Sequence, residues 1–243
     1  NENGLNVQKK PNLKGLKFVQ IDEFYPISPD QHNSFFNYVM NYYIDGFGLD
    51  QDRACLINCN EIPRDNVAEL SEIFPDYNVD LTLRFRDPKS KLEEMQQRTI
   101  HLVDQWCTEY EDSIRNMGGI GFFLGGIGPD GHIAFNIRGS DHHSATRLME
   151  TNFETQATAA VDLGGIEISR GRLVITIGLE TITSNLDAVG IIMAAGEAKS
   201  IIIQDAAESE PDINYPASSI QKLVNARIYL TKGAACQLKD VVM

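Results

Sequence analysis

The sequence is poor in groups that would hold it to nucleic acid or to an anionic surface. Its 243 residues include 21 Lys and Arg against 34 Asp and Glu, so the formal net charge is −13. This acidic balance argues against broad electrostatic binding to nucleic acid or to an anionic membrane. It still allows a small anionic substrate, because a few local donors are enough to hold one phosphate group.

Long apolar runs and cysteines are also scarce. No apolar run reaches about 18 residues, so the sequence predicts no transmembrane helix, and its polar start does not resemble a signal peptide. The four cysteines are Cys55, Cys59, Cys107 and Cys236. Cys55 and Cys59 are not followed by a second pair of metal-type spacing, so we expect neither a zinc site nor a disulfide framework. The chain is therefore predicted to be cytoplasmic, with buried or inert thiols.

What the sequence does contain is an alternation of strand-like and helix-like segments. Apolar runs predict strands at residues 16–21, 54–59, 120–124, 172–177, 188–193 and 226–230. The strongest helix is expected over residues 87–117, where large apolar side chains recur every three or four residues before Gly118 and Gly119. Shorter helices are expected after an N-cap at Asn33 or Ser34, and over residues 196–206 and 232–240.

This alternation predicts an α/β protein with an open, mostly parallel, Rossmann-like sheet and helices on both faces. We expect a single domain over residues 1–243, whose first ten residues form a polar lead-in. Residues 120–124 are a near-continuous apolar run, which is typical of a parallel strand buried on both faces.

A glycine-rich loop follows that strand and carries the most informative chemistry. Gly125, Gly126 and Gly128 would let the backbone approach a ligand closely, at the end of a strand where open α/β sheets bind ligands. Asp130 and His132 lie two residues apart, so the loop can bring both side chains to one cavity as an acid–base pair. The alternative is a simple turn, with the aspartate as a cap and the histidine on the surface.

At this point the sequence resembles a known family. The segment GGIGPDGHIAFN, residues 125–136, resembles the signature of the glucosamine-6-phosphate deaminases, whose fold is shared with the 6-phosphogluconolactonases. Further motifs resemble the family in the same order, namely IDEFY at 21–25, GEAK at 196–199 and PASSIQ at 216–221. The resemblance extends over roughly residues 15–240 and implies the deaminase/lactonase type of α/β fold.

The resemblance also implies a reaction and a role for each matching residue. An amino-sugar phosphate would become a ketose phosphate and ammonia, which is hydrolase and isomerase chemistry of carbohydrate metabolism. Asp22 matches the carboxylate that moves a proton between sugar carbons, His132 matches the group that opens the sugar ring, and Asp130 matches its acidic partner. Lys199 matches a residue that helps to hold the phosphate. The implied reaction needs no metal or organic cofactor, and the implied partners are a small sugar phosphate and further copies of the chain.

Three departures from the family pattern are visible. Ile137 occupies the position of a glutamate that would pair with the histidine, and Asp141 is the nearest carboxylate in the sequence that could replace it. A glycine-rich phosphate loop is expected before Asp22 but is missing, so the chain is either shortened at its N-terminus or divergent. The segment after Arg147 lacks the expected phosphate-binding arginine, which leaves Lys199, Arg138 and Arg147 to compensate.

These departures keep two other functions open. Loss of the glutamate shifts the balance towards a hydrolase resembling 6-phosphogluconolactonase, since the Gly-Pro-Asp-Gly-His motif is common to both families. A non-catalytic sugar-phosphate sensor is the other alternative, although such a binder would not require Asp22, Asp130 and His132 together.

Overall fold

The computed structural model describes residues 11–65, 68–163 and 172–239, so the predicted polar lead-in lies outside the described residues. Its helices are α1 (Phe35–Tyr38), α2 (Leu70–Ile73), α3 (Lys91–Asn116), α4 (Phe153–Leu163), α6 (Leu179–Thr183) and α7 (Ser200–Glu208). Its other helical segments are the π-helix η1 (Val39–Gly46) and the 3-10 turns η2 (Gln51–Arg53), η4 (Pro75–Tyr77), η5 (Leu81–Arg84), η6 (Glu197–Lys199) and η7 (Pro216–Lys222).

The strands form three short sheets in the described part of the chain. The strands are β1 (Phe18–Val19), β2 (Asp22–Tyr25), β3 (Ala54–Cys55), β4 (Phe122–Gly126), β5 (Arg147–Met149), β6 (Leu173–Thr176), β7 (Val189–Ala194) and β8 (Arg227–Leu230). The pairs β1–β3, β4–β7 and β7–β8 are parallel, whereas β2 and β5 pair antiparallel with β6. The α/β class with open sheets is confirmed, but the strands do not join into the one sheet that the sequence predicts.

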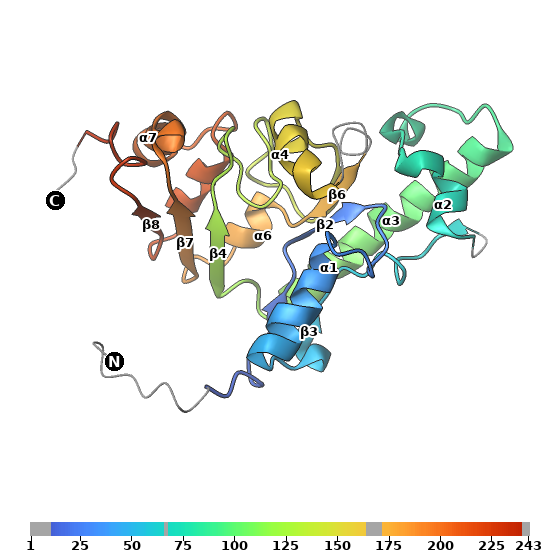
Figure 1. Cartoon of the computed structure of the whole chain (residues 1–243), viewed down its shortest axis with the longest axis horizontal. Coiled ribbons are helices and arrows are strands. Elements are labelled where there is room, and N and C mark those ends of the chain that lie inside the picture. Colours follow the sequence, from blue (N-terminus) through green and yellow to red (C-terminus); the bar gives the residue numbers. More distant parts are fainter. Residues whose placement is uncertain (1–10, 66–67, 164–171, 240–243) are drawn as a thin grey trace.

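The predicted long helix is confirmed as α3, although it begins at Lys91 and not at residue 87. Ser90 is the N-cap, because its hydroxyl accepts a hydrogen bond from the backbone N–H of Glu93 at 3.1 Å. Gly118 and Gly119 follow the last turn with φ values of 100° and 75°, a left-handed conformation that stops a helix. Figure 1 shows α3 and α2 at one end of the molecule and β4, β7 and β8 side by side at the other.

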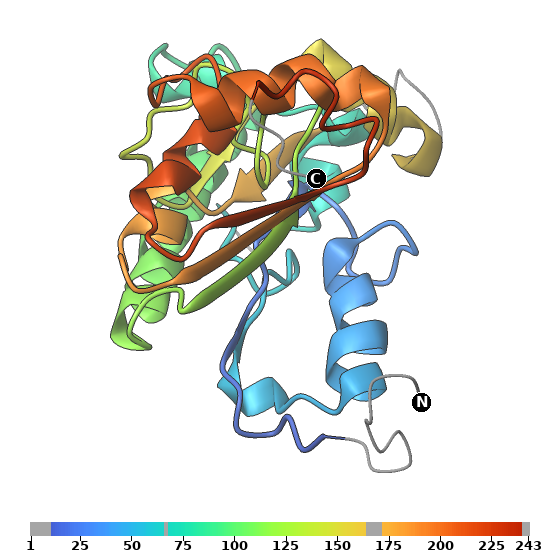
Figure 2. The same cartoon turned by 90° about the vertical axis from the view of Figure 1, so that its left-hand side faces the viewer.

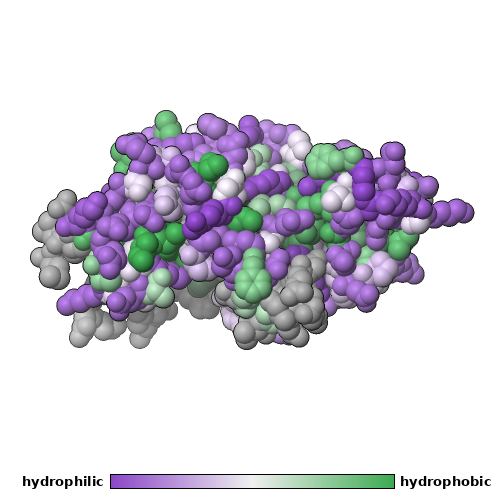
Figure 3. All heavy atoms as spheres, turned by 90° about the horizontal axis from the view of Figure 1, so that it is seen from above, coloured by the Kyte–Doolittle hydropathy of each residue, from purple (hydrophilic) through white to green (hydrophobic). Residues whose placement is uncertain are grey.

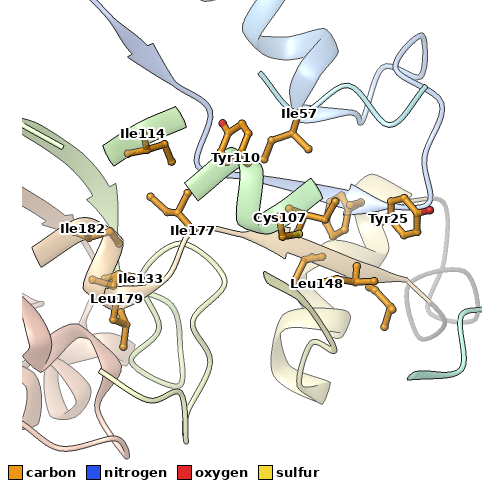
Figure 4. Packing of buried hydrophobic residues seen from close by; sticks show 14 of the residues in the cluster. Tyr25, Ile57, Cys107, Tyr110, Ile114, Ile133, Leu148, Ile177, Leu179 and Ile182 are labelled. Atoms are coloured by element: carbon orange, nitrogen blue, oxygen red, sulfur yellow. The ribbon is translucent and has the colours of Figure 1, made fainter. Parts of the chain in front are cut away.

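Helix α3 supplies one wall of the hydrophobic core. Figure 4 shows Cys107, Tyr110 and Ile114 on this helix, turned towards the buried side chains of the neighbouring strands. The Tyr110 hydroxyl also donates hydrogen bonds to the backbone oxygens of Gln20 (2.7 Å) and Cys55 (2.8 Å). Through these bonds α3 is fixed to β3 and to the segment between β1 and β2, which begins at Asp22.

The prediction that residues 120–124 are buried on both faces is wrong. Phe123 is 2% exposed, but Phe122 is 59% exposed and Leu124 is 49% exposed. On the same face of the neighbouring strand β7, Met193 is 53% exposed. None of the described residues packs over this face closely enough to bury these side chains, whereas helix α7, orange in Figure 2, lies on the other side of the sheet.

The closing helix expected over residues 232–240 is also absent from its described part, residues 232–239, which form turns. The Thr231 hydroxyl accepts hydrogen bonds from the backbone N–H groups of Ala234 (3.4 Å) and Gly196 (3.2 Å). The first of these bonds has the geometry of an N-cap, but the backbone bonds that follow, from Cys236 N–H to Gly233 O (3.4 Å) and from Leu238 N–H to Ala235 O (3.1 Å), span three residues, so turns form in place of an α-helix. Asp240 lies outside the described residues.

No helix in the described part of the chain is both long and apolar enough to cross a lipid bilayer. The face of the molecule seen from above in Figure 3 is largely hydrophilic, with hydrophobic residues in small groups. The thiols are only partly as predicted: Cys59 and Cys107 are buried, Cys55 is half-buried and Cys236 is exposed.

Candidate functional site

A cavity of about 690 Å³ opens where β4 ends in the glycine-rich loop. It lies at the carboxyl end of a parallel strand, the edge where open α/β sheets bind ligands. Its walls come from the start of β2, the segment around α1, the loop after β4, helix α4 and the turn η6. The lining residues are Ile21, Asp22, Phe24, His32, Asn33, Ser34, Phe35, Tyr38, Gly125, Gly126, Ile127, Gly128, Pro129, His132, Ala134, Phe135, Thr155 and Lys199.

Asp130 and His132 form a hydrogen-bonded pair beside this cavity. His132 Nδ1 lies 2.5 Å from Asp130 Oδ1. Burial by itself would raise the pKa of the Asp130 carboxyl, but the hydrogen bond and charge of His132 and the backbone N–H of Arg138 outweigh it and lower the pKa to about 2. Asp130 is therefore ionised near neutral pH and only accepts hydrogen bonds, which makes His132 Nδ1 the donor.

The imidazole of His132 is held between the loop backbone and an aromatic wall. A Cβ atom on Gly128 would lie 2.0 Å from His132 Cε1, so only glycine leaves room for the ring at this position. On its other side the ring stacks on Phe135, with centroids 6.1 Å apart and an interplanar angle of 14°. Phe135 in turn packs against Phe24 and Phe35. These contacts hold the imidazole at the cavity wall, and no hydrogen bond to its Nε2 atom comes from the described residues.

Asp22, the first residue of β2, lines the same cavity in a very different environment. No hydrogen bond to its carboxylate comes from the described residues. Desolvation, with a smaller contribution from the charge of Glu23, raises the pKa of Asp22 to about 8. A carboxyl group with this pKa is largely protonated at neutral pH and can both give and take a proton within the working range of an enzyme.

Glu23 has a structural role that explains its place next to Asp22. Its buried carboxylate accepts hydrogen bonds from the Ser34 hydroxyl (2.7 Å) and from the backbone N–H groups of Phe35 (3.0 Å) and Phe36 (2.7 Å). These donors are at the N-terminus of α1, where unpaired N–H groups favour a negative charge. Glu23 therefore fixes α1 against β2, and Asp22 points into the cavity between them.

Lys199 brings a positive charge to the opposite rim, where η6 follows β7. Its Nζ atom donates a hydrogen bond of 2.6 Å to the backbone oxygen of Ile127 in the glycine-rich loop. Lys199 is the only lysine or arginine among the described residues that line the cavity. The neighbouring loop residues Gly125, Gly126 and Gly128 also line it, so an anionic group near Lys199 would face backbone rather than side chains.

No family model matches the chain, but individual proteins are similar to it. A glucosamine-6-phosphate isomerase of Candida albicans is 34% identical over 134 residues, which are 55% of this chain and 54% of that protein. A glucosamine-6-phosphate deaminase of Bacillus pumilus is 25% identical over 222 residues, which are 91% of this chain and 75% of that protein. The chain resembles the glucosamine-6-phosphate deaminases. The predicted resemblance is thus confirmed, while the aligned part spans only about half the length of the Candida protein.

Solved structures confirm the fold. A monomeric glucosamine-6-phosphate deaminase superposes with a TM-score of 0.68 at 21% identity, over 92% of this chain and 76% of that one. A 6-phosphogluconolactonase from Trypanosoma cruzi superposes with a TM-score of 0.59 at 16% identity, over 93% of this chain and 73% of that one. The chain therefore has the α/β fold that the deaminases and lactonases share.

The structure does not bring every predicted deaminase residue to the cavity. Arg138 is exposed and does not line it; only its backbone N–H contributes, by donating to Asp130 Oδ2 at 3.1 Å. Arg147 instead stabilises the loop that precedes it, through hydrogen bonds from Nη1 to Asn136 Oδ1 (2.9 Å) and from Nη2 to Ser140 Oγ (3.1 Å). Of the three cations expected to compensate for missing phosphate contacts, only Lys199 lines the cavity.

The glutamate that the deaminase pattern places after Asn136 has no replacement at Asp141. Asp141 is exposed, does not line the cavity and accepts a hydrogen bond from the backbone N–H of His143 at 2.8 Å. Ile137 itself is half-buried and also does not line the cavity. The described residues therefore give His132 one carboxylate partner, Asp130.

Sequence reasoning missed two residues at the start of α4. Asn152 Nδ2 donates to Asp130 Oδ2 at 2.6 Å, and Thr155 lines the cavity. The signal that could have revealed them is an asparagine followed three residues later by threonine, at the start of a helix. The part of the chain that the structure describes contains no group of three or more His, Cys, Asp or Glu residues placed to hold a metal ion.

Proposed function

We propose that the chain is a glucosamine-6-phosphate deaminase/isomerase-like enzyme, which converts an amino-sugar phosphate into a ketose phosphate and ammonia. One observation supports this most directly: Asp22, His132 and Lys199 line a single cavity, and Asp130 holds the imidazole. A cavity of about 690 Å³ is of a size suited to one small ligand. The three side chains supply the proton carriers and the cation that such a substrate requires.

In this proposal His132 opens the sugar ring. With Nδ1–H donated to Asp130, Nε2 takes the proton of the anomeric hydroxyl and returns a proton to the ring oxygen as the C1–O5 bond breaks. Ionised Asp130 stabilises the imidazolium that forms between the two transfers. The product of this step is the open-chain amino aldehyde.

Asp22 then acts on the open chain. Its ionised carboxylate removes the proton from C2, which the adjacent C1 carbonyl makes acidic, and a proton is returned to C1. The nitrogen at C2 becomes an imine, and water converts that imine into the ketone with release of ammonia. Lys199 and the glycine-rich backbone would hold the phosphate, so that C1 and C2 lie between Asp22 and His132.

The direct test is to incubate the protein with glucosamine 6-phosphate and to measure fructose 6-phosphate and ammonia together. We expect equal amounts of both products from the unaltered chain and loss of at least about 10²-fold in turnover for His132→Ala. His101→Ala, at an exposed position on α3, is the matched control and should keep full turnover. A folded protein with no turnover, or an active His132→Ala variant, would contradict the proposal.

Lactone hydrolysis is the second candidate, favoured by Ile137 at the position of the deaminase glutamate. Histidine paired with Asp130 would then activate a water molecule against a lactone carbonyl. Assay of the protein with 6-phosphogluconolactone separates the two reactions, because only the lactone releases acid without ammonia. Binding of either sugar phosphate in a calorimeter without turnover would instead support a sensor.

The same proposal extends to the setting of the protein. A small sugar phosphate is the proposed partner, and its recognition rests on Lys199 and backbone donors rather than on an extended basic surface. The four cysteines are free thiols in the structure, which fits a reducing compartment such as the cytoplasm.

A further inference from the structure

Asn152 uses both ends of its side-chain amide. Its Nδ2 donates a hydrogen bond of 2.6 Å to Asp130 Oδ2, and its Oδ1 accepts one of 2.9 Å from the backbone N–H of Thr155. The second bond is an N-cap, which satisfies a free donor in the first turn of α4. One planar group therefore joins the Asp130–His132 pair to the start of a helix that lines the cavity.

This amide completes the set of donors around Asp130. Oδ2 accepts from Asn152 Nδ2 and from the backbone N–H of Arg138, which leaves Oδ1 facing His132 Nδ1. A carboxylate held by donors on one oxygen cannot rotate without breaking them, so its other oxygen stays on the imidazole. The orientation of the carboxylate in turn decides which ring nitrogen of His132 carries the proton.

The helix that Asn152 caps reaches into the cavity. Thr155, three residues further along, is 5% exposed and lines the cavity, yet its hydroxyl has no hydrogen-bond partner among the described residues. Figure 1 shows α4 standing beside the loop that follows β4. A change at Asn152 would thus act on His132 through Asp130 and on Thr155 through the cap.

We propose that Asn152 is a positioning residue, which locks the Asp130 carboxylate and thereby keeps His132 in its Nδ1–H form with Nε2 presented to the substrate. The catalytic consequence rests on the proposed deaminase function, whereas the effect on the imidazole does not. The described residues place no second carboxylate next to His132. Asn152 would instead help to orient the imidazole, through its hydrogen bond to Asp130.

The test compares Asn152→Ser with Asn152→Ala. Serine is a good N-cap but is too short to reach Asp130, so this variant keeps the cap and removes the donor. Alanine removes both, and Ser90→Ala, which removes the cap of α3 away from the cavity, is the control for loss of a cap alone. The ring-nitrogen chemical shifts of His132, assigned by their loss in His132→Gln, report which nitrogen is protonated.

We expect the unaltered chain and Ser90→Ala to show the Nδ1–H form, and both Asn152 variants to show a mixture with the Nε2–H form. In turnover of glucosamine 6-phosphate, Asn152→Ser should lower kcat about tenfold or more with KM within about twofold. An Asn152→Ser variant with the Nδ1–H form and unaltered kcat would reduce Asn152 to a helix cap and overturn the proposal. If the unaltered chain has no turnover, the proposed deaminase function fails, but the ring-nitrogen shifts of His132 still test the positioning role of Asn152. The two proposals can therefore fail separately.

Discussion

The two aspartates of the site lie in opposite electrostatic environments although both belong to one cavity. Asp130 receives donors on both oxygens, from His132, Asn152 and the backbone of Arg138, and its pKa is lowered to about 2. Asp22 receives none from the described residues, and burial raises its pKa to about 8. Two identical side chains thus become a fixed anion and a proton carrier, because hydrogen-bond donors stabilise the ionised form and desolvation penalises it. In the proposed reaction Asp130 would therefore orient His132, and Asp22 would transfer protons.

The strongest test of this difference between the two aspartates is Asp22→Asn, which keeps the shape of the side chain and removes its ionisable carboxyl group. We expect kcat for deamination to fall about 10³-fold, since the base for the C2 proton is lost. Asp112→Asn, at an exposed site on α3, should keep full activity as the matched control. A variant that retains a tenth of the normal kcat would remove Asp22 from the chemistry.

Asp130→Asn tests the fixed anion. The amide can still accept from His132 through its oxygen, but its NH₂ group then faces the donors of Asn152 and Arg138. Loss of the charge and of the acceptor for these two donors should lower kcat about 10²-fold. This loss is smaller than that expected for Asp22→Asn, because His132 itself remains. Steady-state kinetics of both variants should be measured side by side. A larger loss of kcat in Asp130→Asn than in Asp22→Asn would contradict the proposed roles.

The pH dependence of activity distinguishes the two carboxyl groups without altering either. If Asp22 must be ionised to act as a base, kcat/KM rises as pH passes through about 8 and levels off above it. Between pH 7 and pH 9 the ionised fraction grows about tenfold, and the rate should follow. The residual activity of Asp22→Asn should lack this rise; a flat profile for the unaltered chain would show that Asp22 is not the titrating base.

Folding stability gives the smallest expected effect, and its sign differs between the two positions. The pKa of Asp22 is higher in the folded protein than in an unfolded chain, so its contribution to stability is full below about pH 4 and is lost as pH rises through about 8. Urea unfolding should show the unaltered chain losing about 1 kcal/mol per pH unit relative to Asp22→Asn in this range.

Asp130 should behave in the opposite way. Its pKa is lower in the folded protein, so its contribution is present above about pH 4 and disappears as pH falls through about 2. Asp130→Asn should therefore be less stable than the unaltered chain at pH 7 by about 1 kcal/mol or more, with the gap closing in acid. A gap that stayed constant with pH would assign the loss to packing.

Local pattern was sufficient to predict the elements that carry the site. An N-cap at Asn33 or Ser34, a helix stop at Gly118 and Gly119 and a ligand loop over Gly125–His132 could be predicted, because each depends on neighbours in the chain. The start of α3 was predicted at residue 87, four residues before its observed first residue. The partner of Asp130 was not recognisable, since Asn152 is 22 residues away and meets it only after α4 has docked. Single strands could be located in the same way, but not how they pair, because register and direction are set by contacts between distant segments.

Burial was the other quantity that local pattern could not provide. The run IGFFL is as apolar as a strand covered on both faces, yet Phe122 and Leu124 are exposed. Whether an apolar side chain is covered depends on what packs over it, and that is decided outside the run. For the same reason Arg138 resembled a phosphate ligand in the sequence but lies outside the cavity.

The close approach of His132 to Gly128 restricts which sequences this site can tolerate. A single added methyl group at residue 128 would lie 2.0 Å from the imidazole, so even alanine must displace the ring. At Gly121 an added Cβ meets nothing within 4 Å, and at Gly139 the space is equally open, although φ of 91° favours glycine or asparagine there. A library randomised at all three codons and selected for turnover should return many residues at 121, few at 139 and glycine alone at 128.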